Sequence, residues 1–426
     1  MSLQKTREYV IEFIVQAIGM PNDLKYIYDD IPEDIINQIS IALTGRDMDA
    51  ETFDPDIAPD VDGFIQWAQE IYEELCKENN IPAIWKSRWP NGKTFAVALT
   101  HDSDSIDVTE EHLQEVKDRF NESDLKEALE GKKNLYWNVE RIKEIESKFD
   151  FHSSFYFLTS EYNLEQYKDV LDELSKDGWE IGLHAGFGTH ENEGKMNEDI
   201  NEFKRQLKQQ PIGVREHYLQ FDYHNTLNFL EKNQFVYDSS LGFREHPGFL
   251  LGTSLPFNPP RENWEKRKIL ELPLIIMDTS LWGYMNLNED DGMKLIEDYI
   301  ANIKKFNGLL TILWHQEAFL MKKGNIYPKI LEKLAKEECF VSSGIKIAEW
   351  WNSRNDVELS VVEDSEKGWK CNIKNVEKGL CLEMKNFDIS KEIAINGQGR
   401  ITHKSEVDGE IYYKIELEGD CELFYV

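Results

Sequence analysis

The sequence predicts an α/β protein built around a (β/α) barrel-like domain, with a helical appendage before it and a small β domain after it. Three observations support this prediction. Short apolar runs typical of buried strands alternate with amphipathic helical segments through the middle of the chain. The residues before them carry helical periodicity, and the residues after them carry short alternating runs punctuated by glycine. Because strands that alternate with helices are typical of a parallel sheet, the central domain is predicted to contain one.

Residues 1–87 are predicted to form the helical appendage, since apolar side chains such as Tyr9, Phe13 and Ala17 recur at the spacing of one helix face. Residues 88–352 are predicted to form the barrel-like catalytic domain. Its predicted strands are 95–99, 154–158, 180–183, 212–214, 269–272 and 309–313. The helices predicted between them are 139–149, 164–176, 197–209, 226–232 and 292–306.

Residues 353–426 are predicted to form the small β-rich accessory domain. Alternating runs such as Tyr412–Leu417 lie between closely spaced glycines, a pattern typical of short strands joined by turns. The sequence leaves the role of this domain open between carbohydrate binding and a lid or packing module.

The composition excludes some classes of partner. Hydrophobic residues make up 41% of the 426 residues and aromatic residues 12%, which is enough for a substantial core. The net charge is -32, from 48 basic against 80 acidic residues, and such a surface repels phosphate backbones and anionic lipid. We therefore expect no nucleic-acid partner. The charge identifies no substrate, because solubility explains it equally well.

No membrane insertion and no disulfide framework are expected. Charged residues, including Lys5, Arg7 and Glu8, interrupt the N-terminus before any long apolar run develops. The sequence as it stands therefore predicts a cytoplasmic protein, although a chain trimmed of an export signal would look the same. The cysteines are odd in number and form no Cys-x-x-Cys pair. They are expected to be buried or incidental thiols: Cys76, Cys339, Cys371, Cys381 and Cys421.

Polar clusters occur where the predicted strands end. His101, Asp102 and Asp104 follow the first strand, and the later clusters are His184, Arg215 with His217, and His315. In (β/α) barrels, the loops after the carboxyl ends of the strands build the active site. Clusters in phase with successive strands therefore indicate a functional site rather than isolated surface or core histidines.

The order of these segments and their residues resemble the polysaccharide deacetylases (carbohydrate esterase family 4). The resemblance is to a divergent bacterial branch of this family. The resemblance covers roughly residues 88 to 351. Its motifs are Ala98–Asp104 (ALTHDSD), Gly178–His184 (GWEIGLH), Val214–His217 (VREH), Tyr237–Ser240 (YDSS), Glu271–Pro273 (ELP) and Leu313–His315 (LWH). It implies an irregular (β/α) barrel of the polysaccharide-deacetylase type and a metal-dependent hydrolase.

The resemblance also implies roles for the two aspartates. Asp102 corresponds to the family's general base, and Asp104 corresponds to a metal ligand. One inserted residue, Ser103, separates the pair that is usually adjacent in the family, so the two roles could be exchanged. A carboxylate on the metal and a free one beside the attacking water suit hydrolysis, because the ion acidifies the water and the base takes its proton.

The remaining metal ligands are only partly implied. His184 matches the first metal-binding histidine, but Gly188 stands where the family usually has the second. His217 is the preferred third ligand, because it leaves a strand end, and His190, in a glycine-rich loop, is the alternative. The cofactor is predicted to be one divalent ion, most readily Zn, with Co, Mn, Fe or Ni as alternatives.

Other residues complete the predicted site. Arg215 matches the arginine that pairs with the catalytic aspartate, and His315 matches the general acid, with its pKa raised by Asp278 or Asp238. Trp282 and Trp314 are predicted to shape a substrate-binding acyl slot, although core packing explains them as well.

The predicted activity is removal of an N- or O-acetyl group from a carbohydrate. Two alternatives stay open: an amidohydrolase acting on a small non-sugar C–N bond, and a non-catalytic carbohydrate-binding pseudoenzyme. A carbohydrate or small acylated molecule is the expected partner, and the sequence leaves the oligomeric state open.

Overall fold

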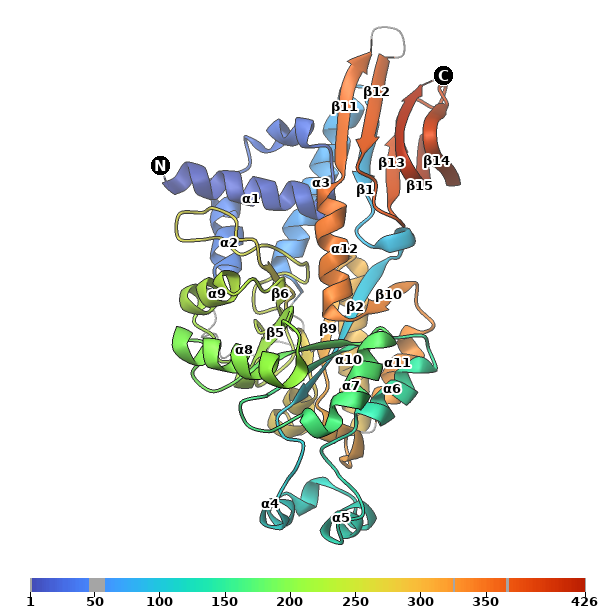
Figure 1. Cartoon of the computed structure of the whole chain (residues 1–426). Helices are drawn as coiled ribbons and strands as arrows, with labels where there is room; N and C mark the ends of the chain where they lie inside the picture. The colour runs from blue at the N-terminus through green and yellow to red at the C-terminus, as the bar shows by residue number, and fades with distance from the viewer. Residues whose placement is uncertain (1, 46–57, 325, 365–367, 426) are drawn as a thin grey trace.

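A curled parallel sheet forms the centre of the molecule (Figure 1). The computed structural model describes residues 2–45, 58–324, 326–364 and 368–425. The strand order is β7-β6-β5-β4-β3-β2-β9-β8, with β10 paired to β2. These strands are β2 (Phe95–Ser103), β3 (Ser154–Phe157), β4 (Glu180–Ala185), β5 (Gly213–Glu216), β6 (Tyr237–Asp238), β7 (Leu270–Glu271), β8 (Ile276–Met277), β9 (Leu309–Leu313) and β10 (Cys339–Ser342).

The sheet curls because its two ends are nearly consecutive in the chain. β7 and β8 stand at opposite ends of the strand order, yet only residues 272–275 separate them. Within that segment, Leu274 donates a backbone hydrogen bond to Leu241, beyond β6, and Ile275 donates one to Thr311 of β9. The segment thus joins the two edges, and the predicted irregular (β/α) barrel is confirmed.

Helices alternate with the strands of the barrel, as the sequence pattern predicts. They are α4 (Glu110–Glu115), α5 (Glu122–Leu129), α6 (Val139–Ser147), α7 (Lys168–Lys176), α8 (Glu193–Leu207), α9 (Tyr223–Lys232), α10 (Glu289–Lys305), α11 (Tyr327–Leu334) and α12 (Gly344–Asp356). α8, α9 and α10 begin about one turn earlier than their apolar periodicity predicts. The side chains of Asn192, Asp222 and Asn288 accept hydrogen bonds from the first free N–H groups and so set these starts.

The predicted N-terminal helices are present as α1 (Ser2–Ile18), α2 (Glu33–Leu43) and α3 (Asp60–Glu78). β1 (Ala83–Lys86) follows them and pairs antiparallel with β13 of a second sheet. That sheet has the order β1-β13-β15-β12-β11, with β14 along β15. Its other strands are β11 (Glu358–Asp364), β12 (Gly368–Lys374), β13 (Cys381–Asn386), β14 (Ile393–Val407) and β15 (Glu410–Tyr425).

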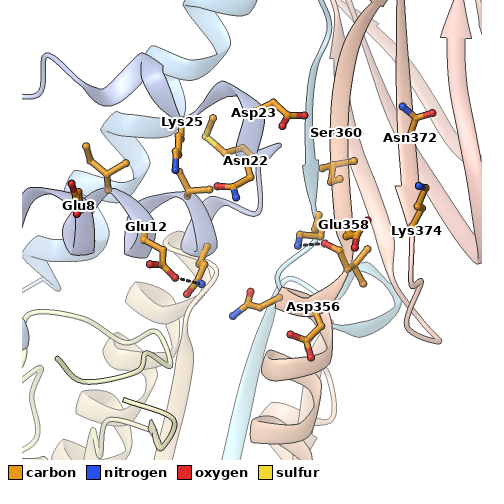
Figure 2. Close-up of a pocket in the computed structure, with 18 of the residues that line it drawn as sticks. Glu8, Glu12, Asn22, Asp23, Lys25, Asp356, Glu358, Ser360, Asn372 and Lys374 are labelled. Atoms are coloured by element: carbon orange, nitrogen blue, oxygen red, sulfur yellow. Dashed lines mark hydrogen bonds between the residues drawn. The ribbon is translucent and has the colours of Figure 1, made fainter. Parts of the chain in front are cut away.

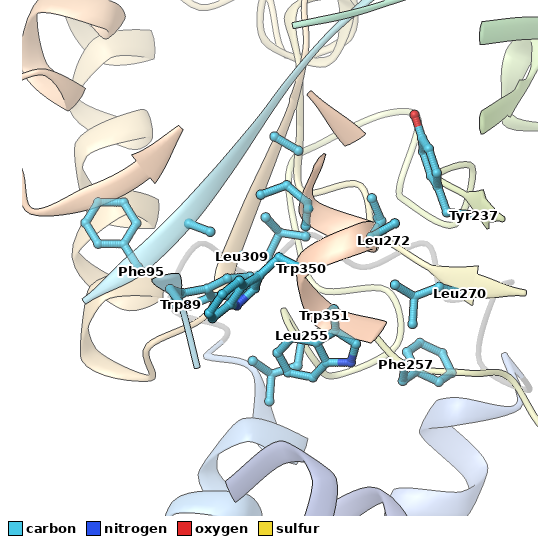
Figure 3. Packing of buried hydrophobic residues seen from close by; sticks show 14 of the residues in the cluster. Trp89, Phe95, Tyr237, Leu255, Phe257, Leu270, Leu272, Leu309, Trp350 and Trp351 are labelled. Atoms are coloured by element: carbon cyan, nitrogen blue, oxygen red, sulfur yellow. The ribbon is translucent and has the colours of Figure 1, made fainter. Parts of the chain in front are cut away.

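Arg354, near the end of α12, joins this helix to the N-terminal part of the chain. Its guanidinium is buried and donates to the backbone carbonyls of Gln16, Ser87 and Lys86 at 2.8, 2.8 and 3.1 Å. One hydrophobic core cluster likewise contains residues of α1–α3, the barrel and the second sheet. Figure 3 shows Trp89, Trp350 and Trp351 beside Phe95 and Leu309 in this core. The domain limits at 87/88 and 352/353 stay predictions.

The two terminal units lie at one end of the barrel, and α4 and α5 project from the other (Figure 1). Because α4 and α5 follow β2, the carboxyl ends of the strands face away from both terminal units. No helix among the described residues is long and apolar enough to cross a membrane. Each cysteine is a free thiol.

Candidate metal centre

The alternation of side chains along β2 separates structural from functional residues. Successive side chains of a strand point to opposite faces, so within β2 Asp102 faces away from its neighbours His101 and Ser103, and Asp104 directly follows the strand. His101 is fully buried, with Nδ1 2.7 Å from the Trp314 carbonyl and Nε2 3.0 Å from Glu146. Its position in this network makes it part of the core. Ser103 separates the two aspartates, and both of them approach Nε2 of His184.

Three side chains form a candidate metal-binding group: Asp104, His184 and His217. One ligand atom from each lies within 4.8 Å of the others. His184 Nε2 is 3.2 Å from Asp104 Oδ1 and 3.0 Å from His217 Nδ1, and His217 Nδ1 is 3.4 Å from Asp104 Oδ1. They come from the carboxyl ends of β2, β4 and β5. In the sheet, β3 lies between β2 and β4, and β5 lies next to β4.

The surroundings orient these ligands. His184 Nδ1 lies 2.9 Å from the Arg215 carbonyl, which accepts its proton and leaves Nε2 aimed at the group. Burial raises the pKa of Asp104, but hydrogen bonds from His184 and His217 outweigh it and hold the pKa well below its ordinary value. An ionised carboxylate and two imidazoles are the donor set of an open zinc-type site.

Asp102 lies beside this group without joining it. Its Oδ2 is 3.8 Å from His184 Nε2 and 3.6 Å from Arg215 Nη1, while its buried Oδ1 has no hydrogen-bond partner among the described residues. Arg215 is itself fully buried and donates to Thr100 and Ser239. The site therefore contains a carboxylate oxygen that is free to accept a proton and has a fixed positive charge nearby.

His315 faces the group from the other side of β2, at the end of β9. Its Nε2 is 4.0 Å from Asp104 Oδ2, and its Nδ1 is 2.7 Å from Asp278 Oδ1. Burial lowers the pKa of the His315 imidazole, but the Asp278 carboxylate outweighs burial, and the pKa is well above its ordinary value. Of the two partners predicted for His315, Asp278 makes the contact. Asp238 instead accepts from Ser240 at 2.6 Å.

The structure does not bring His190 into the candidate metal group. The group contains His217, whereas the backbone carbonyl of His190 accepts a hydrogen bond from Thr226, and its buried Nδ1 has no partner among the described residues. His190 lies beyond the glycine-rich loop after β4, and His217 directly follows β5.

Of the two predicted substrate-binding tryptophans, Trp314 is buried and Trp282 is partly buried. Trp314 is 0% exposed, and its ring meets Trp282 edge to face at 6.2 Å. A Cβ added to Gly292 of α10 would lie 2.4 Å from Trp282 Cη2, so the six-membered ring of Trp282 fills the space beside this glycine. In this arrangement Trp314 offers no surface to a substrate and can act only by supporting its neighbours.

Sequence reasoning missed Glu317, Phe187 and Tyr218. Glu317 lies just beyond His315, and burial holds its pKa above the ordinary range. Phe187 and Tyr218 lie on the loops after β4 and β5, where both are exposed beside His217. The position of the two aromatic residues directly after strand ends is the signal in the sequence that points to them.

A large cleft lies elsewhere on the molecule. About 1080 Å³ of space opens between α1 and the edge formed by β11 and β12, lined by residues such as Asn22, Asp356 and Lys374 (Figure 2). None of the candidate metal ligands lines it. The size of this cleft says nothing about the chemistry, because the convergent ionisable groups lie at the opposite end of the barrel.

No family model matches the sequence, and no curated protein matches it. Several solved structures are similar to part of the chain. A probable polysaccharide deacetylase from Pseudomonas aeruginosa is 15% identical with a TM-score of 0.47, covering 63% of this chain and 94% of its own. Puue allantoinase is 16% identical with a TM-score of 0.46, covering 63% and 93%. Peptidoglycan deacetylase PdaC from Bacillus subtilis is 14% identical with a TM-score of 0.34, covering 62% and 95%.

Similarity at this level assigns no role to any residue of this chain. The barrel, however, is the part of the chain that the sequence motifs span.

Proposed function

We propose that the chain is a metal-dependent deacetylase that removes an N- or O-acetyl group from a carbohydrate. The convergence of Asp104, His184 and His217 beside a free carboxylate oxygen of Asp102 carries this proposal. The donor set fits a divalent ion with an open position, for which zinc is the first choice and Co, Mn, Fe or Ni are alternatives. Bound there, such an ion would supply the Lewis acidity that acidifies water and polarises an acyl carbonyl.

The protein's own side chains would move the protons. Asp102 would accept the proton of the attacking water through the oxygen that has no other partner. Arg215 would help to hold this carboxylate in place, since its Nη1 lies 3.6 Å from Asp102 Oδ2. His315, kept protonated by Asp278 on the opposite side, would donate a proton to the departing nitrogen or oxygen. Base and acid thus lie on opposite sides of the position that an acyl carbon would occupy.

One divalent ion per chain is the first expected result. Elemental analysis of the purified protein, and titration of the stripped protein with Zn²⁺ or Co²⁺, would measure it. Acetate release from an N-acetylated oligosaccharide should then follow the metal content. A protein that takes up neither ion would contradict the hydrolase proposal and favour a non-catalytic carbohydrate-binding protein.

Asp278→Asn is expected to move the alkaline limb of the kcat/KM profile to lower pH. The carboxylate of Asp278 raises the pKa of His315, and the protonated imidazole is the proposed acid. Activity is therefore present below this pKa and falls as pH rises through it, so removing the charge makes it fall earlier. A pH–rate profile of the metal-loaded variant measures the change. Asp298→Asn, an exposed carboxylate of α10, is the matched control. An alkaline limb that does not move in Asp278→Asn would exclude this role.

A further inference from the structure

Exposed aromatic side chains gather on the rim of the candidate active site. Among the described residues, four aromatic side chains are prominently exposed: Tyr26, Phe187, Tyr218 and Tyr284. Three of these lie on segments that follow barrel strands, namely β4, β5 and β8. Isolated exposed apolar residues are ordinary on protein surfaces, whereas a group of them near strand ends indicates a binding site.

Phe187 and Tyr218 form a pair in contact with a candidate metal ligand. Each is 53% exposed, and their ring centroids are 5.3 Å apart at an interplanar angle of 31°. Both rings contact the His217 ring edge to face. The distance between ring centroids is 4.7 Å for Phe187 and 4.5 Å for Tyr218. The pair therefore borders the position where the acyl group would react.

The backbone at Tyr218 is held in an unfavourable conformation. Tyr218 and Leu219 have φ values of 57° and 52°, in the left-handed region that residues with a Cβ rarely adopt. Consecutive residues of this kind persist where the surrounding structure requires them, and such strain is concentrated at functional sites. Here the turn leaves His217 buried and the next side chain, Tyr218, exposed.

The geometry suits a pyranose ring. One face of a pyranose presents C–H groups that pack on an aromatic ring, while its hydroxyl groups stay at the edge and remain hydrated. The acetyl group is too small to cover two half-exposed rings at once. A sugar ring beside the acylated one would cover them, and Tyr284 lies on the opposite side of β2, beyond β9 and β8.

We infer that Phe187 and Tyr218 form a sugar-binding platform for the ring next to the acylated residue. The substrate is then an oligosaccharide or polysaccharide, and a free monosaccharide or a small amide engages only part of the site. This inference rests on the proposed deacetylase function and goes beyond it, because it assigns residues to the recognition of the chain.

Binding measurements on a metal-loaded Asp102→Asn protein test the platform without turnover. Isothermal titration with the pentamer of N-acetylglucosamine should show at least about 10-fold tighter binding than with the monomer, which corresponds to one stacked ring. Adding Phe187→Ala should remove most of this difference, whereas Phe187→Trp should keep it. Tyr26→Ala, which removes an exposed aromatic residue on the N-terminal unit, is the matched control and should keep the difference as well.

Three outcomes would overturn the inference: equal affinity for monomer and pentamer, no binding of either, or pentamer affinity unchanged in both Phe187→Ala and Tyr218→Ala. Metal content, measured on every variant, shows whether His217 is undisturbed. Hydrolysis of 4-nitrophenyl acetate by the wild-type protein separates the two proposals. If the wild type holds metal and cleaves this ester while the platform variants bind the pentamer normally, the platform inference alone is wrong. If the wild-type protein holds no metal and does not cleave this ester, the deacetylase proposal is wrong.

Discussion

Replacing Asp102 with asparagine is expected to lower kcat by about 10²- to 10⁴-fold, the usual weight of a general base. The amide keeps the size of the side chain but cannot take a proton from water. Metal content should stay near the wild-type value, because Asp102 lies outside the group formed by Asp104, His184 and His217. Steady-state kinetics and elemental analysis on the same preparation measure both quantities.

Asp104→Asn is the matched comparison for this experiment. The substitution is the same, but at Asp104 it should weaken metal binding. Oδ1 of Asp104 lies 3.2 Å from His184 Nε2, whereas the nearest approach of Asp102 to that atom is 3.8 Å. If Asp102→Asn loses metal and Asp104→Asn retains it, the two roles are exchanged. Wild-type turnover in Asp102→Asn would exclude this residue as the base.

His217→Ala is expected to weaken metal affinity by more than the about 10- to 100-fold that is typical of losing a residue that merely orients a ligand. Nδ1 of His217 lies 3.0 Å from His184 Nε2, on a turn that directly follows β5, so little reorganisation is needed to bind an ion. Activity should fall with the metal content. Competition with a chelator for Zn²⁺ or Co²⁺ gives the affinity.

His190→Ala is the matched control, because it removes the alternative histidine, which lies outside the metal group. Its affinity should stay close to that of the wild-type protein. A larger loss in His190→Ala than in His217→Ala would reverse the assignment. Unchanged affinity in both variants would indicate a site with two protein ligands, completed by water.

The order of strands and helices in the barrel could be predicted because their patterns are local. A strand such as β9 is a short apolar run, and its predicted range, 309–313, is the observed one. β6 and β8 are only two residues long, too short for a pattern, and they acquire strand geometry by pairing with neighbours. The apolar stripe predicts helix starts that are too late, because capping side chains such as Asn192 and Asp222 lie outside it.

The sequence by itself determined that ionisable residues gather at the carboxyl ends of barrel strands, since the end of an apolar run and the polar residues after it are adjacent in the chain. Only the tertiary structure decided which of them meet. Neighbouring residues of β2 diverge, with His101 bonded to Glu146 in the core and Asp102 beside His184. Asp104 and His217 converge across 113 residues of sequence because β2 and β5 end at the same rim of the barrel. Spacing along the chain contains no information about such distances, which depend on strand order and on the side of the sheet that each residue faces.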